Sequence, residues 1–322
     1  CLASISKEER RSMPDTPKIV VVGSFVVGIT FGAPRLPVLG ETLMGDSFDL
    51  GAGGKGANQA IGATRLGADV HLLACVGDDL FADMAFDIFR REGMALTHLH
   101  RMSGIHTGVG VVTLLPSGEN WIVADYGANL RMTPAHVDAA EELIAQSDIV
   151  LTQCEVPLET VAHAMHLGRK HGAMTIWNPA PAKPVSASLL ANVDLLTPNE
   201  TETRILLGLP PDDPTPTQEL ARRLLGFGIQ QIVVTKGKQG ALIVTPDRCE
   251  ELPAIPVKVI DPTGCGDCFN AALTVGLGQG MSLAAAARQA TYAGAYMATH
   301  LGVINGLPTR AQLDEFRASH QI

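Results

Sequence analysis

Short apolar runs alternate with helical segments along most of this chain, and that alternation constrains the fold more than any other feature. The runs are typical of buried strands closed by Gly, Pro, Asn or Glu, and they cover residues 18–24, 69–77, 147–156, 173–181, 193–200 and 230–237. Helical patterns lie between them at 54–68, 79–94, 133–146, 157–173 and 217–228. The alternation predicts an α/β fold, with a mainly parallel sheet covered by helices on both faces.

Ligands of such sheets bind outside the carboxyl ends of the strands. Polar residues stand just after three of the predicted strands, and we treat them as the first candidates for a site: Glu155, Asn178, Asn199 and Glu202.

Two segments interrupt the alternation, at about 29–50 and 107–126. The first is rich in Pro and Gly and predicts irregular β structure, whereas the second predicts a hairpin that turns at 116–118. We expect the two segments to pair into a small sheet outside the main domain, where they could serve as a lid. The chain from 265 to 300 is predicted to be nearly all helical.

Composition excludes several classes of protein. Of 322 residues 46% are hydrophobic, which suits one large domain over 17–322, and the polar residues 1–16 are predicted to form a disordered N-terminal extension. The net charge is −9 and no basic run is present, so we expect no nucleic-acid partner. No apolar segment reaches the roughly 20 residues that cross a bilayer, so we expect no membrane partner. Six scattered cysteines favour a reducing cytoplasm over a disulfide framework.

The segment DPTGCGDCFN, residues 261–270, combines a glycine-rich turn with a C-x-x-C pair around an acid. Backbone N–H groups at the start of the helix that follows would form an anion hole, and Asp267 could there accept a proton from an attacking hydroxyl. Zinc would need about four ligands, and no second pair of ligands has suitable spacing. A redox pair is expected nearer a first βαβ unit. We therefore interpret Cys265 and Cys268 as small packing residues, although a helix N-terminus can make a thiol reactive.

The segment GAGGKGANQA, residues 51–60, is dense in glycine and then becomes helical. It is neither a Walker A loop, because no Ser or Thr follows Lys55, nor a dinucleotide fingerprint, because it does not follow the first strand. Packing alone could require these glycines. Lys55 and Asn58, about one helical turn apart, favour a polar ligand instead.

Two further segments carry weaker signals. TPNETE, residues 197–202, fits a helix N-cap followed by acidic residues, and it equally fits a site for hydrated Mg²⁺ with phosphates. TKGKQGA, residues 235–241, fits an ordinary connection between strands, or a nucleotide loop whose amides meet phosphate oxygens.

Taken together and in this order, these segments resemble the ribokinase-like (PfkB) family of carbohydrate kinases over about residues 18–310, and most closely its ribokinase and deoxyribokinase type sugar kinases. The resemblance implies a three-layer α/β/α sandwich with a small β-sheet lid, and a homodimer that forms through the lid. It also implies ATP-dependent phosphorylation of a primary hydroxyl on a small sugar or related polyol, with Mg²⁺ as cofactor and K⁺ as activator.

The resemblance also assigns roles to residues. Asp267 is similar to the family's catalytic base, and its anion hole corresponds to Gly264, Cys265 and Gly266. The positions that contact the sugar correspond to Gly54, Lys55, Asn58 and Glu155. The positions that organise Mg²⁺, phosphates and nucleotide correspond to Asn199, Glu202, Thr235, Gly237 and Gly240.

A monovalent-cation site is implied in the same way. It corresponds to the Asp261 side chain and the backbone carbonyls of Thr263, Met297, His300 and Gly302. At Gly306 ribokinases often carry a hydroxyl side chain, so this site would have one ligand fewer.

The chain departs from the family after its first strand. Ribokinases have an Asn and an Asp there that hold secondary hydroxyls of the sugar, whereas this chain has Val26 and Gly28. Losing both partners weakens ribose binding by several kcal/mol at most. We therefore expect a substrate that is deoxygenated, larger or more apolar on that side.

Three other functions were weighed. A dinucleotide-dependent oxidoreductase lacks its G-x-G-x-x-G after the first strand, where VVGSFVVG stands. A catalytically weak or idle sugar-binding relative is compatible with Val26 and Gly28, and a nucleoside kinase of the same fold is also compatible with them.

Overall fold

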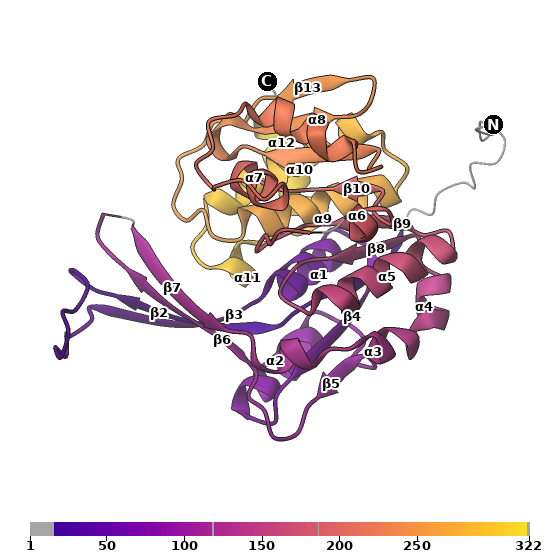
Figure 1. Cartoon of the computed structure of the whole chain (residues 1–322). Coiled ribbons are helices and arrows are strands. Elements are labelled where there is room, and N and C mark those ends of the chain that lie inside the picture. The colour runs from indigo at the N-terminus through magenta and orange to yellow at the C-terminus, as the bar shows by residue number, and fades with distance from the viewer. Residues whose placement is uncertain (1–15, 118, 186, 321–322) are drawn as a thin grey trace.

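The computed structural model describes residues 16–117, 119–185 and 187–320, so the extension predicted over 1–16 lies, except for Thr16, outside the described residues. Within that part of the chain the main sheet has nine strands in the order β13-β12-β11-β10-β9-β8-β1-β4-β5 (Figure 1). Their bounds are β1 (Lys18–Val22), β4 (Asp69–Val76), β5 (Leu99–Arg101), β8 (Ile149–Thr152), β9 (Met174–Trp177), β10 (Leu195–Leu196), β11 (Gln231–Thr235), β12 (Ala241–Val244) and β13 (Cys249–Leu252). Neighbours from β5 to β11 pair in parallel, and β12 and β13 form an antiparallel edge.

Helices cover both faces of this sheet, because its central strands are apolar on both sides. Along β1, Ile19 and Val21 join one core, whereas Val20 and Val22 join the other. The first core receives α1 (Lys55–Arg65), α2 (Leu80–Arg91), α9 (Cys265–Gly278), α10 (Leu283–Ala298), α11 (Val303–Gly306) and α12 (Arg310–Ser319). The second receives α3 (Pro134–Asp138), α4 (Glu141–Ala145), α5 (Leu158–Lys170), α6 (Ala187–Leu190), α7 (Glu200–Leu206) and α8 (Thr217–Leu225). The predicted α/β/α sandwich is confirmed.

A second sheet, the lid sheet, extends away from this body (Figure 1). Its strands are β2 (Val26–Gly32), β3 (Ser47–Gly53), β6 (Gly108–Leu114) and β7 (Asn120–Asp125), in the order β3-β2-β6-β7. The segments far apart in the sequence meet where β2 pairs in parallel with β6. Only three residues, Gly23 to Phe25, connect β1 of the main sheet to β2 of the lid sheet.

Some elements differ from the sequence pattern. The single helix predicted over 133–146 is two helices, α3 and α4, that break at Ala139 and Ala140. Alanine favours helix, so the break comes from tertiary packing and not from local preference. The short strand β5 and the polar edge strand β13 were not predicted.

Across residues 16–117, 119–185 and 187–320, no helix has both the length and the apolarity needed to span a membrane.

Histidines gather beside the β4–β5 edge. The ring centroids of His98 and His100 lie 6.4 Å apart, and those of His100 and His136, on α3, lie 4.9 Å apart. Burial lowers the pKa of His98 and of His100, and neighbouring imidazoles lower both further. The buried Nε2 of His100 has no hydrogen-bond partner in the described part of the chain. This edge is therefore built for neutral imidazoles.

These lowered pKa values make stability depend on pH. The unfolded state binds more protons than the folded state once the pH falls below about 6.5, so acidification destabilises the fold in that range. We expect the melting temperature to be lower at about pH 5.5 than at about pH 7.5, and the His98→Gln/His100→Gln variant to flatten this difference. The control is His166→Gln at an exposed position. An unchanged pH dependence in the double variant would contradict the assignment.

Candidate active site

The candidate site lies where the chain changes direction within the sheet. From β1 the chain adds β4 and β5 on one side, and it later adds β8 and the following strands on the other. The carboxyl ends of β1 and β8 therefore flank a topological switch point, where α/β sheets bind ligands. Ser24 follows β1, and Gln153 and Glu155 follow β8. Asn178 and Thr197 follow the next two strands.

Glycines let the start of α1 lie directly against the residues that follow β1. A Cβ at Gly56 would lie 2.2 Å from the Ser24 nitrogen, and one at Gly23 would lie 2.7 Å from the Gly56 Cα. Gly54, the N-cap of α1, has φ 88°, and a Cβ there would lie 2.7 Å from the Val26 nitrogen. The glycines of residues 51–60 are thus needed for close packing, and that packing brings Lys55 and Asn58 to the switch point.

Glu155 joins the strand ends to this helix start. Its Oε2 accepts hydrogen bonds from the Ser24 hydroxyl at 2.5 Å and from the Lys55 backbone N–H at 2.8 Å. Burial raises the pKa of Glu155 above its usual range, against the opposing effect of the Lys55 ammonium. The carboxylate therefore sits in a place where a further hydrogen-bond donor is favourable.

Asp267 lies in the first turn of α9 and is 5% exposed. Its Oδ2 accepts a hydrogen bond from the Asn58 amide at 2.8 Å, and its Oδ1 accepts one from the Gln59 amide at 2.9 Å. The Asp267 carboxylate raises the pKa of Lys55, so the lysine is held in its charged form. The buried Oδ1 of Asn58 has no partner among the described residues. An unpaired buried acceptor beside a carboxylate suits a ligand hydroxyl.

The start of α9 can bind an anion. Gly264, its N-cap, has a left-handed conformation with φ 79°, and no side chain caps the helix. Among the described residues, no acceptor pairs with the backbone N–H of Gly266 or Asp267. A Cβ at Gly266 would meet no atom within 4 Å, so the space beside these N–H groups is open. The arrangement fits a phosphoryl group approaching the helix N-terminus.

The two cysteines of this turn are not activated. Burial raises the pKa of Cys265 to about 11 and raises that of Cys268 further, and the Cys268 thiol contacts the Ala293 carbonyl at 3.2 Å. Both thiols are therefore protonated near neutral pH, which removes the reactivity that the helix N-terminus could have given them. Across the described residues, no three His, Cys, Asp or Glu side chains are placed to hold a metal ion together.

Asn199 and Glu202 form a capping box at the start of α7. The Asn199 Oδ1 accepts from the Glu202 N–H at 2.8 Å, and the Glu202 Oε2 accepts from the Asn199 N–H at 2.7 Å. The sequence left open a cap or a ligand site, and the cap is present. Burial raises the pKa of Glu202, and the Lys55 and Asp267 charges also act on it, so it belongs to the same electrostatic centre.

Residues 235–241 connect β11 to β12. The Thr235 N–H donates to the Pro198 carbonyl at 2.9 Å, which places this loop beside Asn199. Gly237 has φ 52° and open space at its Cβ position, whereas a Cβ at Gly240 would lie 2.0 Å from the Leu252 carbonyl oxygen. Gly240 therefore shapes the loop, and Gly237 leaves one side of it accessible.

Asp261 ties two loops together beside α9. Its Oδ1 accepts from the Thr263 N–H at 2.9 Å, and its Oδ2 accepts from the Gly302 N–H at 3.2 Å. The Met297 carbonyl, at the end of α10, accepts from the His300 N–H at 3.0 Å. A Cβ at Gly306 would lie 2.7 Å from the Met297 sulfur, and one at Gly264 would lie 3.2 Å from the Met297 terminal methyl carbon. The Met297 side chain thus fills the space at both glycines.

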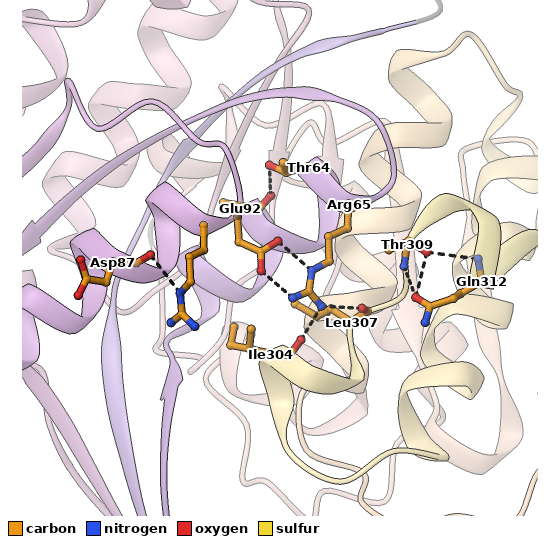
Figure 2. Close-up of polar contacts among 10 residues, drawn as sticks. Thr64, Arg65, Asp87, Glu92, Ile304, Leu307, Thr309 and Gln312 are labelled. Carbon is orange, nitrogen blue, oxygen red and sulfur yellow. Dashed lines mark hydrogen bonds and ion pairs between the residues drawn. The ribbon is translucent and has the colours of Figure 1, made fainter.

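Arg65 holds α11 in place (Figure 2). Its guanidinium donates to the carbonyls of Ile304 at 2.6 Å and Leu307 at 2.8 Å, and it pairs with Glu92. Val303 of the same short helix packs at Gly264, where an added Cβ would lie 2.7 Å from it. The far end of α1 therefore fixes the segment that borders the start of α9.

The structure adds residues that the sequence motifs did not single out. Ser24, Gln59, Gln153, Thr197 and Asn270 are all buried and hydrogen-bonded around Asp267. Each one follows a predicted strand or occupies a helix start near a named candidate, and that position was the available signal. From the sequence alone, where the contacts of a side chain are unknown, Gln59 cannot be told from any other residue of a helix.

Comparison with known proteins gives consistent results. The family description "pfkB family carbohydrate kinase" matches residues 16–310. The deoxyribokinase of Salmonella typhi is 35% identical over 92% of this chain and 98% of its own, and the ribokinase of Bacillus subtilis has the same identity and coverage. The structure of Arabidopsis thaliana ribokinase complexed with ribose and ATP has a TM-score of 0.86 at 29% identity, and it covers 94% of this chain and 98% of that one.

The close approach at Gly56 predicts a sharp contrast between two glycines. Gly56→Ala forces its Cβ into the backbone of residues 23–24, so we expect a loss of about 2–4 kcal/mol in the free energy of unfolding. Gly266→Ala enters open space and has an ordinary helical position, so its stability is expected to stay within about 0.5 kcal/mol of wild type. Urea denaturation measures both. Equal stability of the two variants would refute the described packing.

Proposed function

The chain belongs to the pfkB family of carbohydrate kinases and is a phosphotransferase with an alcohol acceptor, and we propose that it phosphorylates a primary hydroxyl of a small sugar or related polyol with ATP. One observation carries the proposal. A buried carboxylate, Asp267, lies beside the open N-terminus of α9 and beside an unpaired buried acceptor on Asn58. This arrangement supports the roles of general base, anion hole and hydroxyl-binding group that we propose for them.

The proposed reaction transfers one proton and one phosphoryl group. The substrate hydroxyl gives its proton to Asp267, and its oxygen forms a bond to the γ-phosphorus of ATP. The bond between that phosphorus and the bridging oxygen breaks, and ADP leaves with the electron pair. The N–H groups of Gly266 and Asp267, with the turn Gly264–Gly266, face the charge that develops on the phosphoryl oxygens.

Four residues are proposed to bind the sugar. Asn58 offers its free Oδ1 to a hydroxyl, and Glu155 is buried with a raised pKa and so favours a hydroxyl donor. Lys55 is held charged by Asp267 and suits a substrate oxygen or a phosphoryl oxygen. Gly54, the N-cap of α1, directly precedes Lys55 and is proposed to contact the sugar through its backbone.

The nucleotide and its Mg²⁺ are proposed to lie beside α7 and the loop 235–241. Glu202 uses Oε2 in the capping box, while its Oε1 has no hydrogen bond to a residue that the structure describes, so Glu202 and Asn199 fit a role in holding hydrated Mg²⁺. When bound, Mg²⁺ supplies charge that offsets the phosphates. Thr235 pairs with Asn199, and Thr235, Gly237 and Gly240 of this loop would meet the phosphates of ATP.

A K⁺ site is proposed around Asp261. The Asp261 carboxylate already brings Thr263 and Gly302 together, and oxygen ligands of this kind suit a hard cation. The carbonyls of Thr263, Met297, His300 and Gly302 complete the proposed set. A Cβ at Gly306 would lie 2.7 Å from the Met297 sulfur, so a side-chain ligand at that position needs the end of the Met297 side chain to move.

The lid sheet supports a substrate other than ribose. Gly28 pairs with Gly51 and Gly110, and Gly110 pairs with Ala124, so one row across four strands has almost no side chains. Val26 lies on the same face, 3.9 Å from where a Cβ of Gly110 would be. Tyr126, which follows β7, is close enough to Glu155 for that carboxyl to raise its pKa together with burial, so this end of the lid sheet borders the site. We propose a substrate that is larger or less hydroxylated on its lid side.

Dimerisation through the lid sheet is proposed from its other face. Exposed apolar side chains stand there in two rows, including Phe31, Phe48, Val111, Trp121 and Val123. A patch of this kind marks an interaction surface on a protein. Sedimentation equilibrium that returns the mass of one chain would refute the dimer.

The five described cysteines carry free thiols, which supports a reducing cytoplasm.

A weak or idle sugar-binding relative and a nucleoside kinase are the alternatives, because Val26 and the glycine row remove the contacts expected for ribose. The intact surroundings of Asp267 favour an active enzyme over an idle one. A screen of alcohols separates sugars from nucleosides.

Replacing the proposed base tests the mechanism. Asp267→Asn should lower kcat about 10²- to 10⁴-fold, because the base is lost, while the dissociation constant of the alcohol changes little. The matched control is Asp83→Asn, an exposed carboxylate in the first turn of α2, which should keep full activity. ATP turnover and equilibrium binding are the measurements. Turnover that survives in Asp267→Asn would refute the mechanism.

The substrate proposal is tested with a panel of sugars, polyols and nucleosides, each with ATP and with or without K⁺. We expect alcohols other than ribose to have the highest kcat/KM. Gly28→Asp places a carboxylate on the row and should raise kcat/KM for ribose about 10-fold relative to the preferred substrate. Thr30→Asp, one row further out on the same face, should not. Ribose far ahead of all others in wild type would overturn the proposal.

A further inference from the structure

A connected set of buried amides lies behind Asp267. Gln59 is fully buried, and its Nε2 donates to the Asp267 Oδ1 and to the Asn178 Oδ1, both at 2.9 Å. The Gln59 Oε1 accepts from the Gln153 Nε2 at 2.6 Å, and Gln153 is 1% exposed. Each hydrogen of the Gln59 amide therefore has one acceptor, and its oxygen has one donor.

The orientation of this chain of amides follows from the carboxylate. A carboxylate only accepts hydrogen bonds, so the Gln59 amide must turn its nitrogen toward Asp267 and its oxygen toward Gln153. Gln153 must then donate, and its own Oε1 has no partner within the described residues. That oxygen lies 2.4 Å from where a Cβ of Gly23 would be, so it occupies space that only glycine leaves. A buried unpaired oxygen is unfavourable and calls for a compensating role.

The two oxygens of Asp267 have different surroundings. Oδ2 is bonded to Asn58, whose free Oδ1 marks the side on which a ligand hydroxyl fits. Oδ1 is bonded to Gln59, on the fully buried side. Each oxygen therefore has one protein donor, and the unpaired Asn58 Oδ1 lies beside Oδ2, so a substrate hydroxyl approaches Oδ2.

We propose that Gln59, oriented by Gln153, is a positioning residue that holds Oδ1 of Asp267, so that Oδ2 alone receives the proton of the substrate hydroxyl. In the transfer step the substrate O–H bond breaks and an Oδ2–H bond forms, while the Gln59 hydrogen bond stays on Oδ1. The donated bond fixes the orientation of the carboxylate, so that Oδ2 faces the substrate hydroxyl. This inference rests on the proposed function.

The test compares Gln59→Met and Gln153→Met with wild type, using ATP, Mg²⁺ and the best alcohol from the substrate panel. Gln59→Met keeps the volume and removes the donor, so we expect kcat to fall about 10- to 100-fold with KM for the alcohol within about 3-fold. The acid limb of the kcat profile should also move, because the proposed base loses a hydrogen bond. Gln153→Met should show the same changes, smaller in size.

The matched control is Gln289→Met. Gln289 is a buried amide of α10 that donates to the Ala272 carbonyl of α9 and does not contact Asp267. We expect this variant to lose stability but to keep the pH profile of wild type. If Gln59→Met does not fold, Gln153→Met decides the question by the same readouts.

The outcomes distinguish a failure of the proposed function from a failure of the role proposed for Gln59. Wild type that phosphorylates no alcohol of the panel overturns the proposed function, and the inference falls with it. If wild type is active and the Gln59→Met or Gln153→Met variant keeps the pH profile of wild type, only this inference is overturned. A loss of stability without a change in kcat or in the acid limb also overturns it, because the amides would then only join the structural elements.

Discussion

The contact between the start of α1 and the residues that follow β1 is the constraint on which the rest of the site depends. At Gly56 a Cβ would lie 2.2 Å from the Ser24 nitrogen, so helix and strand end approach at backbone distance. This approach brings the Lys55 N–H and the Ser24 hydroxyl to the same oxygen of Glu155. It also sets Asn58 and Gln59 against the two oxygens of Asp267, which arrives from the other end of the chain. Three distant segments thus meet through glycines that have no chemistry of their own.

The charged side chains around Lys55 suit the binding of a polar ligand. Lys55 is a cation near Asp267, Glu155 and Glu202, and the pKa values of both glutamates are raised by burial. One cation among three carboxylates leaves an excess of negative charge in a partly buried place. This charge supports the proposed binding of hydroxyl donors and cations there. The proposed partners of the phosphate oxygens are the N–H groups at the start of α9.

Much of the fold and of the candidate site could be predicted from the sequence, because the spacing of apolar residues and the Gly and Pro residues that end helices and strands are local signals. Strand–helix alternation gave the sandwich, and the glycine-rich turns marked the neighbourhood of Lys55, Asn58 and Asp267. Contacts between distant residues carry no such signal. Gln59 and Gln153 stand 94 positions apart, and only the fold shows that one orients the other. The prediction of one helix over 133–146 was wrong for the same reason, since Ala139 and Ala140 favour the helix that packing interrupts.

The Met297 side chain restricts how this family member can evolve. Its sulfur lies 2.7 Å from where a Cβ of Gly306 would be, and its terminal methyl carbon lies 3.2 Å from that of Gly264. A side chain at Gly306 therefore meets the end of the Met297 side chain, which is flexible and has to move aside. The effects of substitutions at positions 297 and 306 should then depend on each other, because the two side chains share one space.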